Sequence, residues 1–249
     1  MKNKILNIKN LSKSYGAFKV TDEIAIDLNF DEIHALIGPN GAGKSTLIKQ
    51  IVGSVKHDIG SIVLDQEDIT DLNDVERAKI GISRTFQVSS IIPKFSASDN
   101  IILSLLDKSK ETFQLFKNIR KNKELASKAK NILKEIELLE KSNVLASELS
   151  HGDRRKLEVG LALAMDPKVF LFDEPMAGLD ESGTKMMINL FKKIKSSSPI
   201  LLIEHDMDAV FALADRVSVI NYGKIVATGT VDEIRSNDLV RDVYLGYEI

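Results

Sequence analysis

A run of nine residues early in the chain has the composition of a loop that holds phosphate. It consists of Gly38, Pro39, Asn40, Gly41, Ala42, Gly43, Lys44, Ser45 and Thr46, between the strand-like segment HALI and the helix-like segment LIKQIV. The glycines allow backbone N–H groups to turn inward around phosphate oxygens, and the following helix adds the positive end of its dipole. Lys44 would place its charge on the β- and γ-phosphates of a nucleotide, and Ser45 would offer a hydroxyl to Mg²⁺.

Two adjacent carboxylates, Asp173 and Glu174, follow the apolar segment VFLF that ends at Phe172. Side chains alternate between the faces of a strand, but the residue beyond a strand end can turn toward the same cleft as its neighbour. Asp173 would hold Mg²⁺ through its water shell, and Glu174 would orient or deprotonate the attacking water. An acidic pair at a strand end is, on its own, more typical of a helix cap or a solvated turn. Its occurrence together with the phosphate-loop pattern favours the catalytic interpretation.

The elements that must position these residues are three short apolar runs, each followed by a turn and a helical pattern. They are IHALIGPN, KVFLFDEP and PILLIEHD, at residues 33–40, 168–175 and 199–206. Continuous apolar strands need cover on both faces, so this alternation predicts an α/β fold with a largely parallel sheet. The phosphate site should lie at the carboxyl ends of the strands.

A second kind of pattern occupies the middle of the chain. Apolar residues recur at helical spacing, with lysines and glutamates between them, at Ile119, Leu125, Ala129, Ile132, Leu133, Ile136 and Leu139. We expect a helical subdomain at 88–160, inserted in a single domain whose core is 1–87 and 161–249. The charged helix face is interpreted as solvated surface. The segment after Asn221 predicts a hairpin around Tyr222–Gly223 and then a polar helix.

Composition excludes several classes of function. The chain has 249 residues, and 34 Lys and Arg against 36 Asp and Glu give a net charge of -2, so the global balance does not indicate nucleic acid as a partner. There is no cysteine, which removes disulfides and thiolate chemistry. The N-terminal segment lacks the apolar core of a signal peptide, and the longest apolar stretches are far short of the roughly 20 residues that span a bilayer. We therefore expect any membrane association to go through a partner.

The segment Leu149–Asp153, LSHGD, lies upstream of the acidic pair and resembles the signature of the ATP-binding-cassette family, usually Leu-Ser-Gly-Gly-Gln. The resemblance implies that Ser150 and Gly152 contact the γ-phosphate held by the opposite subunit. His151 and Asp153 depart from the family form. Ser150-x-x-Asp153 is equally typical of a helix capping box, and a pH-sensing role for His151 is a further alternative.

Further landmarks follow in the order of the same family: Tyr15 in SKSYGAF, Gln87 in RTFQ, the AGLD segment at 177–180, and His205 in LLIEHD. By this resemblance Tyr15 would stack on adenine. Gln87 would contact Mg²⁺ or the lytic water, and His205 would donate a hydrogen bond to the γ-phosphate. Asp180 would pack across a subunit interface or cap a helix. Each residue in isolation is also compatible with an ordinary structural role.

The resemblance implies a P-loop NTPase core with a mainly parallel sheet, an N-terminal antiparallel β region and the inserted helical subdomain. It also implies the cofactors ATP and Mg²⁺. A second ATPase subunit, identical or different, would complete the γ-phosphate site, and closure on ATP would drive transmembrane permease subunits. A solute-binding protein would be an indirect partner. The chain would be cytoplasmic and peripheral on the inner face of the cell membrane, with the segment 88–100 as the candidate permease-docking region.

Within the family, four strings resemble the ATPases of branched-chain amino-acid and urea importers. They are RTFQ followed by SDNI, SHGDRRKLEVGLAL, AGLD after DEPM, and VYLG. A lipopolysaccharide-export ATPase shares the VYLG ending and is the alternative. Soluble cassette proteins of translation or DNA repair usually carry two cassettes or long coiled coils, and nucleotide kinases and GTPases lack the signature. A regulatory module without catalysis is disfavoured because Lys44, Glu174 and His205 are present.

Overall fold

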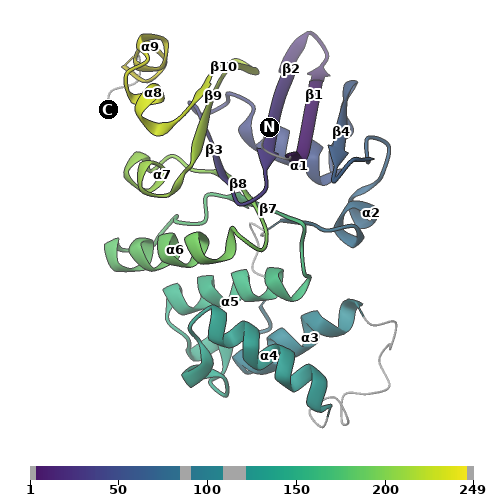
Figure 1. Ribbon diagram of the computed structural model, residues 1–249, viewed down its shortest axis with the longest axis vertical. Coiled ribbons are helices and arrows are strands. Elements are labelled where there is room, and N and C mark those ends of the chain that lie inside the picture. The colour runs from purple at the N-terminus through teal and green to yellow at the C-terminus, as the bar shows by residue number, and fades with distance from the viewer. Residues whose placement is uncertain (1–3, 85–90, 109–121, 246–249) are drawn as a thin grey trace. The chain divides into compact units, whose positions relative to one another are not determined.

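The structure is a computed structural model, and it describes residues 4–84, 91–108 and 122–245 (Figure 1). The chain divides into two compact units. The first unit combines Met1–Arg84, Lys168–Ala177 and Phe191–Ile249. The second unit combines Thr85–Pro167 and Gly178–Leu190.

An antiparallel sheet of four strands opens the first unit. Its order is β2-β1-β4-β5, with β1 at Lys4–Tyr15, β2 at Phe18–Asn29, β4 at Ile59–Leu64 and β5 at Glu67–Asp68. The long strands β1 and β2 pair directly across a two-residue turn in which Gly16 has φ +61°. This sheet confirms the predicted N-terminal antiparallel β region.

A six-stranded sheet forms the centre of the first unit. Its order is β10-β9-β3-β8-β7-β6, with β3 at Ile33–Ile37, β6 at Ile82–Arg84, β7 at Val169–Asp173, β8 at Ile200–Ile203, β9 at Arg216–Asn221 and β10 at Lys224–Gly229. All neighbours pair in parallel except β9 and β10, which form the predicted hairpin around Tyr222–Gly223. The mainly parallel sheet is therefore confirmed, and the carboxyl ends of β3, β8 and β7 meet at one edge.

Apolar side chains of the parallel strands fill a core on each face of this sheet. On one face, Leu36, Leu171 and Leu201 pack in a cluster with Leu47 of α1 and with Ile8 of the antiparallel sheet. On the other face, Ala35, Ile37 and Val217 pack in a cluster with side chains of α7, α8 and α9. Because neighbouring residues of β3 point to opposite cores, every position of that strand is buried.

The helices of the first unit are short. They are α1 at Lys44–Val52, α2 at Asp74–Lys79, α7 at Met207–Leu213, α8 at Val231–Arg235 and α9 at Asp238–Leu245. Side-chain caps begin several of them. Asn73 accepts a hydrogen bond from the main chain of Glu76, and Thr230 accepts one from Glu233. Both sites are capping boxes, which satisfy backbone donors that a helix start leaves free.

The second unit is helical, which confirms an inserted α-helical region. It contains α3 at Ala97–Lys108, α4 at Lys123–Glu135 and α5 at His151–Ala164, with single 3₁₀ turns at Leu139–Lys141 and Ala146–Glu148. Helix α6, at Glu181–Ile194, begins in this unit. At Gly160 of α5, an added Cβ would lie 2.6 Å from Ile136 and 2.9 Å from Ile101. A side chain at this position would therefore have to displace the ends of these two isoleucine side chains.

Among the residues that the structure describes, no helix is both long enough and apolar enough to cross a bilayer.

His34 is a polar residue enclosed by the core of the first unit. Its Nδ1 lies 2.7 Å from the main-chain oxygen of Asp27, and its Nε2 lies 2.8 Å from the Ser218 hydroxyl. Burial, helped by the nearby Arg216 cation, lowers the pKa of His34 to about 4. An unfolded histidine titrates near pH 6.5, so the unfolded chain takes up a proton at a pH where folded His34 stays neutral.

We expect acid to destabilise the protein through His34. A lowered pKa contributes stability that is complete above pH 6.5 and is lost as the pH falls toward the folded value, so the free energy of unfolding should drop by about 2 kcal/mol between about pH 7 and pH 5. Urea titrations at both pH values, on the native protein and on His34→Gln, measure this contribution. The same pH dependence in both proteins would contradict it.

Candidate functional site

The loop from Gly38 to Gly43 joins β3 to α1 and fits tightly against neighbouring main chain. A Cβ at Gly38 would lie 2.1 Å from the main-chain oxygen of Ile220 in β9. A Cβ at Gly43 would lie 2.5 Å from the main-chain oxygen of Val20 in β2, and Gly43 has φ +108° at the start of α1. Both positions therefore admit only glycine, and the loop is fixed by β9 and β2.

Exposure within this loop separates its packing side from its open side. Ala42 is buried with the two tightly packed glycines, and Pro39 and Thr46 are half-buried. Asn40, Gly41 and Ser45 are exposed. Ser45 stands in the first turn of α1, where backbone N–H groups have no partner within the helix. The open side is thus the side on which a phosphate would meet hydroxyl and N–H donors.

Lys44 is buried and its ammonium group is held by the loop itself. Its Nζ donates hydrogen bonds to the main-chain oxygens of Gly38, at 2.6 Å, and Pro39, at 3.0 Å. Burial lowers the pKa of Lys44, and the negative charges of Glu174 and Asp173 partly oppose that effect. The phosphate loop and the acidic pair therefore share one electrostatic environment.

The two carboxylates at the end of β7 differ in environment. Asp173 is the last residue of the strand, and its side chain is only 3% exposed. Glu174 turns out of the strand with φ +54°, and its main-chain N–H donates to Ile203 of β8 at 2.9 Å. A left-handed conformation is unusual for glutamate and costs about 1–2 kcal/mol. This turn leaves the side chain of Glu174 about half exposed, directly beside the buried Asp173.

Arg84, at the end of β6, is a site residue that sequence reasoning missed. Its Nη2 donates to Oδ2 of Asp173 at 3.2 Å. Burial raises the pKa of Asp173, and the Arg84 charge limits that rise. The Nε of Arg84 is buried and has no hydrogen-bond partner. A signal was present in the sequence, because Arg84 is the first residue of the RTFQ string that contains Gln87, but the pairing of β6 with β7 is what brings it to Asp173.

His205 follows β8 and lies next to Glu174. The distance between His205 Nδ1 and Glu174 Oε1 is 3.4 Å, and both side chains are accessible. An imidazole and a carboxylate at this distance form a charged pair when the histidine is protonated. Parallel pairing of β7 with β8, in which Asp173 stands opposite Ile203, places the two residues together.

Tyr15 closes β1 and presents its ring outward. The residue is 56% exposed, and the Lys13 ammonium group lies 5.5 Å from the ring centroid. Phe18, at the start of β2, pairs with Tyr15 and is also exposed. An exposed aromatic ring of this kind has a free face on which a planar base can stack.

The LSHGD segment lies in the second unit, where Ser150 is the N-cap of α5. The Ser150 hydroxyl accepts the Asp153 N–H at 3.1 Å and donates to the Asp153 carboxylate at 2.7 Å. Lys141, in the 3₁₀ turn at Leu139–Lys141, donates to the same carboxylate. Burial favours a higher pKa for Asp153, but the hydrogen bonds from Lys141 and Ser150 outweigh it and lower the pKa. Asp153 therefore turns back to its own helix end, and its cation is Lys141.

The neighbours of this cap complete the placement of the predicted residues. His151 is exposed, and a Cβ added to Gly178 would lie 3.5 Å from its ring. Gly152 is half-buried, and an added Cβ there would meet only the methyl group of Met186, at 3.6 Å. Asp180 accepts the Gly183 N–H at 2.8 Å, so it caps α6. Gln87 lies outside the described residues.

The structure thus brings Lys44, Asp173, Glu174 and His205 together in the first unit, at the carboxyl ends of β3, β7 and β8. Tyr15 belongs to the same unit. Ser150 and Gly152 belong to the second unit. Among the described residues, no group of three or more His, Cys, Asp or Glu side chains converges as a metal cage.

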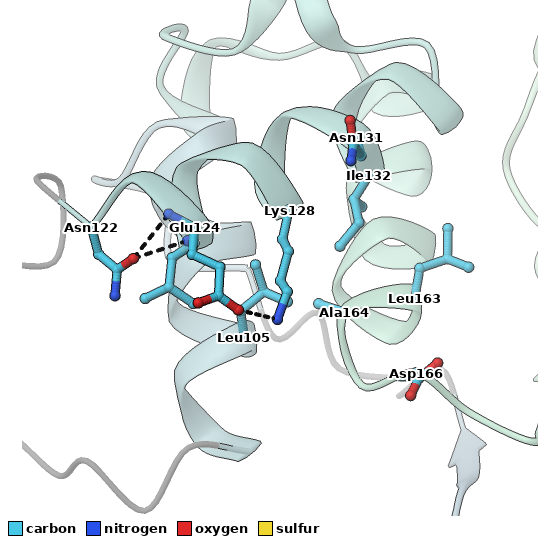
Figure 2. Close-up of a pocket in the computed structure, with 10 residues that line it drawn as sticks. Leu105, Asn122, Glu124, Lys128, Asn131, Ile132, Leu163, Ala164 and Asp166 are labelled. Carbon is cyan, nitrogen blue, oxygen red and sulfur yellow. Dashed lines mark hydrogen bonds and ion pairs between the residues drawn. The ribbon is translucent and has the colours of Figure 1, made fainter.

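Figure 2 shows a cavity of about 650 Å³ in the second unit, lined by residues of α3, α4 and the end of α5. Leu105, Leu125 and Ile132 contribute apolar surface. Lys128 Nζ and Glu124 Oε1, which also line it, form an ion pair at 2.8 Å. None of the predicted site residues lines this cavity.

Known proteins resemble this chain in both its family models and its sequence. A family model described as ABC transporter matches residues 21–177, and one described as Branched-chain amino acid ATP-binding cassette transporter matches residues 224–248. The lipopolysaccharide export system ATP-binding protein LptB of Haemophilus influenzae is 33% identical over 243 residues, 97% of each chain. The high-affinity branched-chain amino acid transport ATP-binding protein LivG of Escherichia coli is 33% identical over 255 residues, 99% of each chain.

A solved structure gives the same picture. The ADP conformation of MJ1267, an ATP-binding cassette of an ABC transporter, superimposes with a TM-score of 0.86 at 32% identity. The match covers 98% of this chain and 99% of that one.

The tight fit at Gly43 predicts a steric requirement for nucleotide binding. Gly43→Ala would push a Cβ against Val20, whereas Gly41→Ala, also at positive φ, has no atom within 4 Å of its Cβ. We expect Gly43→Ala to weaken binding of a fluorescent ATP analogue at least about tenfold more than Gly41→Ala, a difference of roughly 1.4 kcal/mol. Fluorescence titration of both variants tests this, and equal affinities would show that the contact with Val20 is unimportant.

Proposed function

The chain belongs to the ATP-binding-cassette transporter family, and from this premise we propose that it is the ATP-hydrolysing subunit of an importer for branched-chain or other amino acids. The ATPase part rests on the convergence of Lys44, Asp173, Glu174 and His205 at one edge of the sheet. The importer part rests on the C-terminal match at residues 224–248 to a branched-chain amino-acid transporter model.

The phosphate loop binds the triphosphate in this proposal. Backbone N–H groups of residues 38–46 surround the phosphates, and Lys44 exchanges its two main-chain carbonyl partners for phosphate oxygens. That exchange is favourable because a buried ammonium group gains an opposite charge. Tyr15 stacks on the adenine ring with its exposed face.

Magnesium fits the oxygen donors at this site. Mg²⁺ prefers one or two carboxylates together with substrate phosphates and water, and it does not need a cage of protein ligands. The Ser45 hydroxyl and the Asp173 carboxylate would hold it, with Gln87 as a third ligand proposed from the sequence alone. When bound, the ion neutralises phosphate charge. Arg84 keeps Asp173 in place through its 3.2 Å hydrogen bond.

Hydrolysis in the proposal depends on Glu174 and His205. Glu174 is the accessible member of the acidic pair and orients or deprotonates the attacking water. His205 lies 3.4 Å from it and donates a hydrogen bond to the γ-phosphate. Gln87 positions the same water, and Lys44 stabilises the charge that develops on the phosphate oxygens.

Completion of the site requires a second cassette, identical or different. Ser150 and Gly152, at the start of α5, contact the γ-phosphate bound by the opposite subunit. The helix N-terminus and the exposed residue Ser150 suit an anion, and the hydrogen bond that Lys141 donates to Asp153 offsets the charge of the carboxylate that would repel it. Closure of the dimer on ATP drives separate permease subunits. A solute-binding protein delivers the solute to these permeases. The protein is proposed to be peripheral on the inner face of the membrane.

Lipopolysaccharide export is a second candidate function. It is favoured by one observation, the 33% identity to LptB over 97% of the chain, which equals the identity to LivG. Deletion of the gene in its own organism distinguishes the two functions. We expect uptake of labelled leucine, isoleucine and valine to fall, and to return with the native gene but not with Glu174→Gln. Unchanged uptake together with accumulation of lipopolysaccharide in the inner membrane would support export instead.

Glu174→Gln tests the catalytic proposal directly. Glutamine keeps the shape of the side chain but cannot accept a proton, so we expect ATP binding to persist while turnover falls at least about a hundredfold. The trapped ATP should also hold two chains together. Phosphate release, ATP affinity and mass by light scattering are measured on the same samples. Undiminished turnover would remove Glu174 from the catalytic role.

A further inference from the structure

Glu204 is a buried carboxylate that takes no part in the proposed binding or hydrolysis of ATP. It lies between the end of β8 and His205, and it is only 2% exposed. Its Oε1 accepts the main-chain N–H of Met176 at 2.8 Å, and its Oε2 accepts the main-chain N–H of His205 at 3.1 Å. The main-chain N–H of Asp206 is a third donor to it.

These hydrogen bonds join two separate segments of the chain. Met176 lies two residues after Glu174, and the main-chain oxygen of Glu174 accepts the N–H of Ala177 at 3.2 Å. The second donor is the main-chain N–H of His205, whose own imidazole is the proposed γ-phosphate donor. One side chain therefore ties the turn that bears the proposed base to the turn that bears the proposed γ-phosphate donor.

Only an ionised carboxylate matches this set of donors. Its two oxygens accept from both sides, whereas an amide has one oxygen and one NH₂ group. A glutamine would point its NH₂ group at one of the two main-chain N–H groups, and that buried donor would lose its partner. Burial of a carboxylate is costly, and it raises the pKa of Glu204. Three main-chain N–H donors are the compensation.

We propose that Glu204 is a positioning residue that holds the Glu174 turn and the His205 turn in the register needed for hydrolysis. This inference rests on the proposed ATPase function. Glu204 acts through main chain only, because its oxygens are bonded to the N–H groups of Met176 and His205 and its side chain is enclosed. In this proposal, Glu204 keeps the left-handed turn at Glu174 in place at the end of β7. The Glu174 Oε1 then lies 3.4 Å from the Nδ1 of His205.

The chain contains a matched control, Glu32. This carboxylate is also 2% exposed and also accepts a main-chain N–H, from Asn29 at 2.6 Å. It pairs with Arg216 and directly precedes β3, at the amino end of the parallel strands. The phosphate loop follows the other end of β3. Glu32→Gln therefore disturbs a buried carboxylate of the first unit without touching either turn.

The test compares Glu204→Gln, Glu204→Asp and Glu32→Gln in the full-length protein. We expect Glu204→Gln to lower kcat at least about tenfold while the Kd for MgATP, set by the phosphate loop, changes less than about twofold. Glu204→Asp shortens the side chain by one methylene group, so its oxygens no longer reach the main-chain donors, and kcat should fall similarly. This second variant tests the proposal if the glutamine variant does not fold. Glu32→Gln should lower Tm and leave kcat per folded molecule within about twofold.

A double-mutant comparison with His205→Ala distinguishes a positioning role of Glu204 from a general loss of stability. If Glu204 acts through the His205 turn, Glu204→Gln should cost much less in a His205→Ala background than in the native protein. Native kcat in both Glu204 variants, or equal losses in the two backgrounds, would overturn the inference and leave the proposed function intact. A native protein that binds ATP but never hydrolyses it, alone or with its permeases, would contradict the proposed function itself.

Discussion

The parallel pairing of β3 with β8 and of β8 with β7 is the constraint on which the candidate site depends. His34 stands opposite Leu201, and Leu171 stands opposite Leu201 from the other side. With this register, three chain segments far apart in sequence end at the same edge of the sheet. The phosphate loop, the acidic pair and the Glu204–His205 turn follow these three ends. Apolar cores on both faces fix the register, because a slip by one residue would exchange the two faces.

The charged side chains at this edge of the sheet are affected both by burial and by neighbouring groups of opposite charge. Burial works against the charged form of Lys44 and of Asp173, and each is opposed by nearby opposite charge. Glu204 is kept by main-chain donors and Asp173 by Arg84. The buried groups are therefore fixed in place, whereas Glu174 and His205 remain accessible. This division suits a site whose rigid part binds phosphate and whose exposed part meets water.

The unusual signature of the second unit has a local physical explanation. Asp153 occupies the third position of a helix whose N-cap is Ser150, and a carboxylate there interacts favourably with the helix N-terminus. The cation that pairs with it is Lys141, which lies nine residues before Ser150 in the 3₁₀ turn at Leu139–Lys141. The capping-box pattern in the sequence predicted that Asp153 turns back to its own helix end, but nothing in that pattern indicated Lys141 as the cation. The fold of the segment between α4 and α5 brings the ammonium group of Lys141 to the Asp153 carboxylate.

Local patterns in the sequence were sufficient for the fold class. Continuous apolar runs predicted buried parallel strands, and the phosphate-loop pattern, the acidic pair and His205 could be located from residue types alone, because backbone conformation and strand burial depend on short segments. The roles of these residues remain predictions. Arg84 beside Asp173, Glu204 between two turns and Lys141 at Asp153 were decided only by the tertiary structure. The two residues of each contact lie on different segments, and no local pattern in the sequence indicates that these segments meet. The order of the strands and the packing of the turns determine which side chain meets which partner.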